Sequence, residues 1–150
     1  MKNLILTLAI VLSYNYSNAQ LFTLEHDHST IQVEDIEQSA KFYAGILNLK
    51  ELETPWPENQ MIRFFETGKN QQLHIAQVDN YGDLKVNKVL HLAFAVKDFN
   101  GYLKYLSEHN ISYFNFNGEV NEVQQRPDGV RQIYLLDPDS YWIEINDAKH

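Results

Sequence analysis

The chain of 150 residues contains no cysteine. This absence excludes a disulfide framework, a thiolate metal site and a cysteine nucleophile. Any metal ion would therefore be held by imidazole and carboxylate groups alone. Low-complexity segments are missing as well, and aromatic residues make up 13% of the chain. We therefore expect an ordinary globular domain with a packed core.

Basic residues are few, and they do not gather into a cluster. The chain has 12 Lys and Arg against 20 Asp and Glu, which gives a formal net charge of −8 at pH 7. Nucleic acids and anionic membrane surfaces repel a chain of this charge. We therefore expect a small-molecule substrate as the partner, and neither nucleic acid nor a membrane.

A hydrophobic run long enough to cross a bilayer is also missing. The apolar run from Leu4 to Leu12 is about half the length that a membrane-spanning helix needs. Lys2 precedes it and Ser17-Asn18-Ala19 follows it, which completes the three-part pattern of a secretory signal. We predict a signal peptide over residues 1–19 and a secreted or periplasmic protein. The alternative is an apolar first strand that resembles a signal sequence.

The predicted mature chain, residues 20–150, is long enough for one domain with a hydrophobic core. Within it the pattern His-x-x-apolar-x-Val-x-Asp-apolar occurs twice, beginning at His28 and at His91. Later positions repeat at an offset of 70 residues instead of 63, which indicates a seven-residue loop insertion within 115–129. At this offset Phe64 aligns with Tyr134, Leu73 with Ile143, His74 with Glu144 and Ile75 with Ile145. Such a repeat predicts two units of the same fold, at about 25–80 and about 88–147.

The two units have the same predicted order of elements. In each, a strand ends at an Asp that can cap a helix, Asp35 in the first unit and Asp98 in the second. The helices have apolar faces, formed by Ile36, Ala40, Tyr43 and Leu47 in the first and by Phe99, Tyr102, Leu103 and Leu106 in the second. Three strand-like runs follow, near 50–54, 61–66 and 72–78 in the first unit and near 112–116, 130–136 and 141–146 in the second. The prediction is an α+β fold of two βαβββ units related by a pseudo-twofold axis.

Polar residues stand between apolar neighbours in these strands, at His74, His91 and Glu144. Taken singly, each has an ordinary interpretation, because a core His can be hydrogen-bonded and an alternating Glu can face solvent. The repeat favours another interpretation, since it pairs His28 with His91 and His74 with Glu144. Four metal-capable groups at two matched positions predict a site for one divalent ion: zinc, nickel, cobalt, manganese or ferrous iron.

The other histidines are weaker candidates. His26 would face the same side of the first strand as His28, but only His28 aligns with His91 in the repeat. His109 lies at a predicted helix end and His150 at the terminus, where we expect both to be exposed to solvent.

Two motifs resemble those of the vicinal oxygen chelate superfamily, which includes glyoxalase I, bleomycin resistance proteins and dioxygenases. The opening, His28-x-x-Ile-x-Val-x-Asp35 followed by Ser39-Ala-Lys-Phe42-Tyr43, is similar to the opening of glyoxalase I. The closing Asp137-Pro-Asp-Ser140-Tyr-Trp-Ile-Glu144 is similar to the Asp-Pro-Asp-Gly-x-x-x-Glu of the superfamily, with Ser140 in place of the usual Gly. The resemblance covers essentially the whole mature chain. It implies paired βαβββ units around a metal held by His28, His74, His91 and Glu144, with His74 where Glu or Gln is common.

The resemblance also implies an activity and a set of pocket residues. It favours lyase, isomerase or epimerase chemistry on a small oxygen-rich metabolite, in a homodimer, with Glu144 moving a proton. Glutathione-dependent members carry Arg and Asn where this chain has Gln32 and Val78, which disfavours glyoxalase I activity itself. Around the metal we expect Arg63 to hold an anionic substrate and three aromatic residues to form walls. These aromatic residues are Trp56, Tyr134 and Trp142.

Besides a fosfomycin-type thiol transferase, which no loop of this chain singles out, two other functions stay open at this stage. One is an iron-dependent dioxygenase, for which two His and one Glu would serve as ligands if His74 did not coordinate. The other is a drug-sequestering type of binding protein without catalysis, whose relatives lack the metal ligands. The sequence does not decide whether the two units close on each other or on the units of a second chain.

The signal peptide can be tested on exported protein. We expect N-terminal sequencing of material recovered outside the cytoplasm to begin at Gln20, because the small residue Ala19 precedes the predicted cleavage site. Exported protein that still begins with Met1 would contradict this prediction.

Overall fold

A computed structural model describes residues 25–82 and 87–149 of the chain. The predicted signal peptide, the first residues of the mature chain and His150 lie outside the described residues. Within the described residues, no helix has the length and apolar character needed to cross a membrane.

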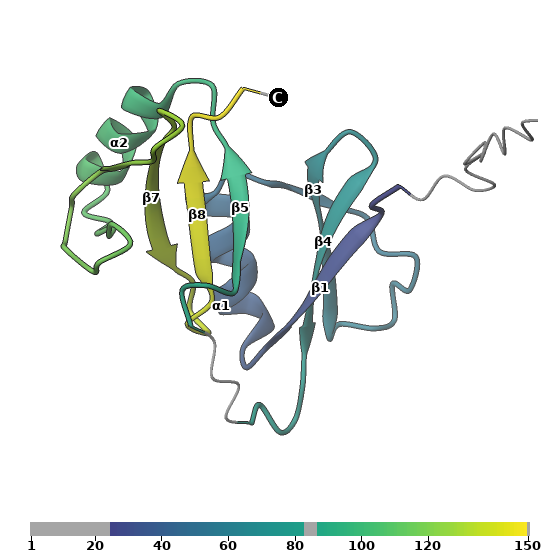
Figure 1. Cartoon of the computed structure of the whole chain (residues 1–150). Helices are drawn as coiled ribbons and strands as arrows, with labels where there is room; N and C mark the ends of the chain where they lie inside the picture. The colour runs from purple at the N-terminus through teal and green to yellow at the C-terminus, as the bar shows by residue number, and fades with distance from the viewer. Residues whose placement is uncertain (1–24, 83–86, 150) are drawn as a thin grey trace, which may run out of the picture.

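Both units fold as βαβββ (Figure 1). The first contains β1 (His28–Val33), α1 (Ile36–Lys41), a π-helical turn η1 (Phe42–Ile46), β2 (Lys50–Leu52), β3 (Ile62–Gly68) and β4 (Gln71–Gln77). The second contains β5 (His91–Ala95), α2 (Phe99–Glu108), β6 (Gln124–Gln125), β7 (Arg131–Leu136) and β8 (Trp142–Asn146). The predicted α+β class and the two repeated units are confirmed.

The two sheets have the same topology, with strand orders β1-β4-β3-β2 and β5-β8-β7-β6. The first strand of each is parallel to the last, and the other pairs are antiparallel. Their registers match as the sequence repeat predicts. The row Thr30–His74–Phe64 in the first sheet corresponds to the row Ala93–Glu144–Tyr134 in the second.

One predicted strand is wrong. The run near 112–116 does not form a strand, and only Phe114 makes isolated bridges, to Val120 and Tyr134. The chain reverses at once because Asn115 organises a turn, accepting the N–H of Gly118 on its carbonyl and that of Glu119 on its side chain. The outer strand of this sheet is instead the short β6, which lies within the predicted insertion and pairs with β7.

The helices begin where the sequence places their caps. The side chain of Asp35 accepts the backbone N–H groups of Glu37 and Gln38, and that of Asp98 accepts the N–H of Gly101. These bonds satisfy donors that the first helical turn leaves without partners. The predicted apolar faces of both helices lie against the core.

Alternation along the strands gives each sheet an apolar face, and the two apolar faces share one core. Ile31, Val33, Leu73 and Ile75 belong to the first sheet; Ile133, Leu135, Ile143 and Ile145 belong to the second. A small cavity of about 150 Å³ is lined by Ser29 and Leu73 from the first apolar face and by Leu92 and Phe94 from the second. The core sides of the sheets therefore face each other, and their other sides face outward.

The turn between β7 and β8 joins the two units. The hydroxyl of Tyr43 donates to Asp137 at 2.7 Å, and that of Ser39 donates to Asp139 at 2.6 Å. The backbone N–H of Glu34 also donates to Asp139, at 2.7 Å. Ser140, which replaces the usual glycine, has the left-handed φ of 68° that a glycine adopts more easily. These bonds hold the start of α1 against the last hairpin.

The buried carboxyl of Asp137 makes stability depend on pH. Burial raises the pKa of Asp137 to about 6, although the hydrogen bond from Tyr43 opposes the shift. The folded state therefore binds this proton more tightly than the unfolded chain. Its contribution to stability is complete below about pH 4 and is lost as the pH rises through about 6. From pH 5 to 7 we expect the free energy of unfolding, measured with urea, to fall by about 1 kcal/mol more in the parent than in Asp137→Asn.

A second variant tests the cause of this shift. Tyr43→Phe removes a donor that favours the charged carboxylate, so we expect it to move the fall in stability to higher pH. Equal pH dependence in the parent and in Asp137→Asn would contradict the assignment.

Candidate functional site

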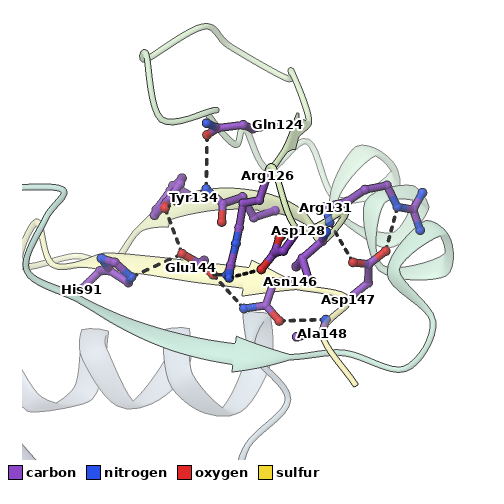
Figure 2. A network of polar contacts seen from close by, with 12 residues as sticks. His91, Gln124, Arg126, Asp128, Arg131, Tyr134, Glu144, Asn146, Asp147 and Ala148 are labelled. Atoms are coloured by element: carbon purple, nitrogen blue, oxygen red, sulfur yellow. Dashed lines mark hydrogen bonds and ion pairs between the residues drawn. The ribbon is translucent and has the colours of Figure 1, made fainter. Parts of the chain in front are cut away.

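The outward side of the second sheet carries two of the four predicted metal ligands, His91 and Glu144. We call this pair the second half-site. Register places Ala93, Glu144 and Tyr134 in one row, and His91 lies two residues before Ala93 on the same side. Figure 2 shows the side chains of His91, Glu144 and Tyr134 in one network of polar contacts. Nε2 of His91 lies 3.3 Å from Oε2 of Glu144.

Glu144 is only 5% exposed, and partners surround its carboxylate. The hydroxyl of Tyr134 donates to Oε2 at 2.9 Å, and the side-chain amide of Asn146 donates to Oε1 at 2.7 Å. The guanidinium of Arg126 lies 3.9 Å from Oε1 (Figure 2). A buried carboxylate is costly without such partners, so these contacts allow Glu144 to remain between two buried Ile residues.

The ring of His91 is oriented by the backbone. Its Nδ1 lies 2.9 Å from the carbonyl oxygen of Lys88. A carbonyl only accepts hydrogen bonds, so Nδ1 carries a proton, while Nε2 faces Oε2 of Glu144. Burial, and then the bond to Glu144, raise the pKa of Tyr134, so its hydroxyl stays a donor. The half-site thus presents an imidazole nitrogen beside a carboxylate whose two oxygens are held by Tyr134 and Asn146.

The outward side of the first sheet carries His28 and His74, the first half-site. Their rings are stacked, with centroids 4.2 Å apart and an angle of 14° between planes. Nδ1 of His28 contacts Asp27 at 2.6 Å, and Nε2 of His74 contacts Gln72 at 2.9 Å. Each ring therefore keeps one nitrogen for a ligand. Burial, and then the neighbouring His28, lower the pKa of His74, which keeps that ring neutral at pH 7.

The structure brings the four predicted ligands together as two pairs. Within residues 25–82 and 87–149, no group of three or more His, Asp or Glu is placed to hold a metal ion. The reason is geometric, because each half-site lies on the outward side of a different sheet while the inward sides share the core. His26 contacts Ser29 instead of joining the first half-site, and His109 is exposed, as expected.

The predicted pocket residues lie in different places. Tyr134 and Trp142 are on the face of the second half-site, with ring centroids 6.4 Å apart. Trp56 is half-exposed and lies against Phe64, the neighbour of His74. Arg63 is on the opposite side of its strand, in register with the buried Ile75. There it forms ion pairs with Glu37 and Glu51, so its charge is committed away from the first half-site.

Sequence reasoning missed several residues of the second half-site. Asn146 and Gln132 are in register with each other and lie two residues from Glu144 and Tyr134, so strict period-2 counting would have found them. Lys88 and Arg126 lie in loops, where the sequence carries no such signal. The ammonium of Lys88 is 4.2 Å from the ring centre of Trp142, and it donates to the carbonyls of Asn115 and Phe116. This anchor holds the carbonyl that orients His91.

Known proteins share this fold and sequence pattern. Residues 26–145 match the family model of the Glyoxalase/Bleomycin resistance protein/Dioxygenase superfamily. The uncharacterized protein YwbC of Bacillus subtilis is 27% identical over 123 residues, which cover 79% of this chain and 94% of the relative. A putative glyoxalase family protein from Bacillus anthracis has a TM-score of 0.67 at 23% identity, covering 85% of this chain and 98% of that one. A glyoxalase/dioxygenase from Nostoc punctiforme has a TM-score of 0.66 at 24% identity, covering 81% and 89%.

The hydroxyl of Tyr134 provides a test of the network. Tyr134→Phe leaves one oxygen of the buried Glu144 without its donor, so we expect a loss of about 1–2 kcal/mol in the free energy of unfolding measured with urea. Tyr113→Phe is the control, because the Tyr113 hydroxyl bonds to no described residue, and we expect it to change stability little. Equal losses in the two variants would show that the bond to Glu144 does not stabilise the fold.

Proposed function

The chain belongs to the glyoxalase/bleomycin resistance/dioxygenase superfamily, and we propose that it is an exported, metal-dependent enzyme of this group. The proposed reaction is of the lyase, isomerase or epimerase type, on a small oxygen-rich metabolite. The observation that carries the proposal is the matched placement of the two half-sites. His74 is in register with Thr30, two residues after His28, and Glu144 is in register with Ala93, two residues after His91.

The chemistry of the side chains fits a divalent ion. Three imidazoles and one carboxylate form a nitrogen and oxygen donor set that suits zinc, nickel, cobalt, manganese or iron. His28, His74 and His91 each have one ring nitrogen in a hydrogen bond, and the other nitrogen has none within the described residues; that of His91 faces Glu144. Such second bonds are the usual support of metal-binding imidazoles. We therefore assign His28, His74, His91 and Glu144 as the residues that would hold one ion.

We propose that a second copy of the chain completes the site in a homodimer. The first half-site of one chain would meet the second half-site of the other, since the two lie on outward sides of separate sheets. Exposed apolar residues beside the half-sites support this arrangement. Val89 and Leu90, just before His91, are 76% and 65% exposed, and Trp56, beside the first half-site, is 52% exposed. Burial of these side chains between two chains would stabilise the dimer.

Glu144 is the residue to which we assign proton transfer. A divalent ion, when bound, supplies electrostatic stabilisation of an enolate or oxyanion on the substrate. Glu144 is the one carboxylate in the ligand set, and it accepts the substrate proton. Tyr134 and Asn146 hold its two oxygens in place, so the carboxylate is oriented before substrate arrives. Trp142 and Tyr134 form an aromatic wall beside it.

Metal content tests the proposed site. We expect about one equivalent of metal per chain, by elemental analysis, in residues 20–150 purified without chelator. The double variant His91→Ala/Glu144→Ala should lose it, and His109→Ala, which alters an exposed ring, should keep it. Zinc, nickel or cobalt would favour lyase or isomerase chemistry, and iron would favour a dioxygenase. If the parent held no metal, even after incubation with excess ions, the proposed enzyme would be contradicted and a small-molecule binding protein would be favoured instead.

Complementation tests whether the site is shared between chains. We expect neither His28→Ala/His74→Ala nor His91→Ala/Glu144→Ala to bind metal alone. A mixed dimer of the two variants has one intact site, so mixing after denaturation and refolding should restore metal to about half of the mixed dimers' sites. Failure to restore any metal, in dimers shown to be mixed, would contradict a site shared between chains.

A further inference from the structure

Arg126 begins the turn that connects β6 and β7. Its backbone N–H donates to Val130 at 2.8 Å, and its carbonyl accepts the N–H of Gly129 at 2.9 Å. Gly129 has a φ of 88°, which this tight turn requires and which glycine adopts without strain. The turn lies above the outward side of the second sheet, and the Arg126 side chain extends from it toward Glu144 (Figure 2).

The two ends of the guanidinium have different surroundings. Nη2 donates to Asp128 at 2.6 Å, which anchors one edge of the group. Nη1 is 3.9 Å from Oε1 of Glu144, too far for a hydrogen bond, and donates to no described residue. The side chain is 39% exposed. One edge of the guanidinium is thus fixed, and the other is directed at the half-site with its donors available.

Lys88, a second cation on this face, already has hydrogen-bond partners. The ammonium of Lys88 donates to the carbonyls of Asn115 and Phe116 and lies over Trp142. The charge of Arg126 is only partly balanced, by Asp128 and by Glu144 at a distance. In the proposed function the charge of Glu144 is shared with a metal ion, so less negative charge would balance Nη1, and a negative group of the substrate would be favoured there.

We propose that Arg126 is a specificity-determining residue that selects a substrate with two acidic groups. One end of such a substrate supplies the neighbouring oxygens that chelate the metal, and the Arg126 guanidinium binds a second carboxylate or phosphonate. The planar guanidinium suits both groups, because its N–H donors match the spacing of their oxygens. The inference rests on the proposed function and narrows the substrate class to small dianionic acids.

Paired ligands test the selection. Malate and 2-hydroxybutyrate share a metal-chelating 2-hydroxy acid, but only malate has a second carboxylate. In titrations of the cobalt-loaded protein followed by visible absorption, we expect malate to bind about tenfold more tightly than 2-hydroxybutyrate. In Arg126→Gln we expect the ratio of the two affinities to fall to about one, with binding of 2-hydroxybutyrate and the cobalt content unchanged.

Arg131→Gln is the matched control, because it removes the same charge from the other side of the sheet. Arg131 pairs with Asp147 and lies over the ring of Phe99, so its loss should leave the ratio near tenfold. An equal ratio in the parent and in Arg126→Gln, with cobalt bound, would overturn the role of Arg126 while leaving the proposed function intact.

If the protein binds no cobalt, a metal-free measurement tests whether Arg126 binds an anion. Glu144→Gln removes the negative charge that faces Nη1, so we expect this variant to bind methylphosphonate, seen as saturable NMR shifts of the backbone amides of residues 126–130. These amides are those of residues 126 and 128–130, since Pro127 has no backbone N–H. The double variant Glu144→Gln/Arg126→Gln should show no shifts. Absence of shifts in the single variant would then overturn the anion site, whereas their presence would support it although the proposed metal enzyme had failed.

Discussion

The structure depends on the requirement that the apolar sides of both sheets be covered. The apolar sides of the two sheets share one core with α1 and α2. Because side chains alternate along each strand, the residues between the apolar ones point to the opposite side of the sheet. The residues between the apolar ones, including His74 and Glu144, must lie on the outward sides, away from the core that holds the chain together.

The position of Glu144 follows from the cost of burying a charge. A carboxylate that is 5% exposed requires donors, and Tyr134 on β7 and Asn146 on β8 supply them. His91 on the edge strand and Arg126 in a turn lie 3.3 Å and 3.9 Å from the same carboxylate. Because both oxygens of Glu144 accept hydrogen bonds, the carboxylate is oriented before any ligand binds. Such preorganisation is what a catalytic carboxylate and a selective cation both need.

The joint between the units determines how the half-sites are related. Tyr43 and Ser39 from the first unit hold Asp137 and Asp139 of the second, so the start of α1 and the β7–β8 turn move together. This contact keeps the sheets with their core sides facing each other, and it keeps the half-sites on separate outward surfaces. A site that needs both half-sites therefore requires a second chain in the proposed function, and the exposed Val89 and Leu90 would then be covered.

The sequence by itself determined the two βαβββ units and the equivalence of His74 with Glu144. Both depend on the periodicity of apolar residues and on an internal repeat, which can be recognised in a single sequence. It placed a strand near 112–116 wrongly, because the turn at Asn115 depends on side-chain bonds with no strong sequence signal. Tertiary structure alone decided that Arg63 faces Glu37 and Glu51, that Arg126 faces Glu144, and that the four predicted ligands form two pairs. These relations join residues far apart in the chain, and they follow from how the two sheets pack, which periodicity does not encode.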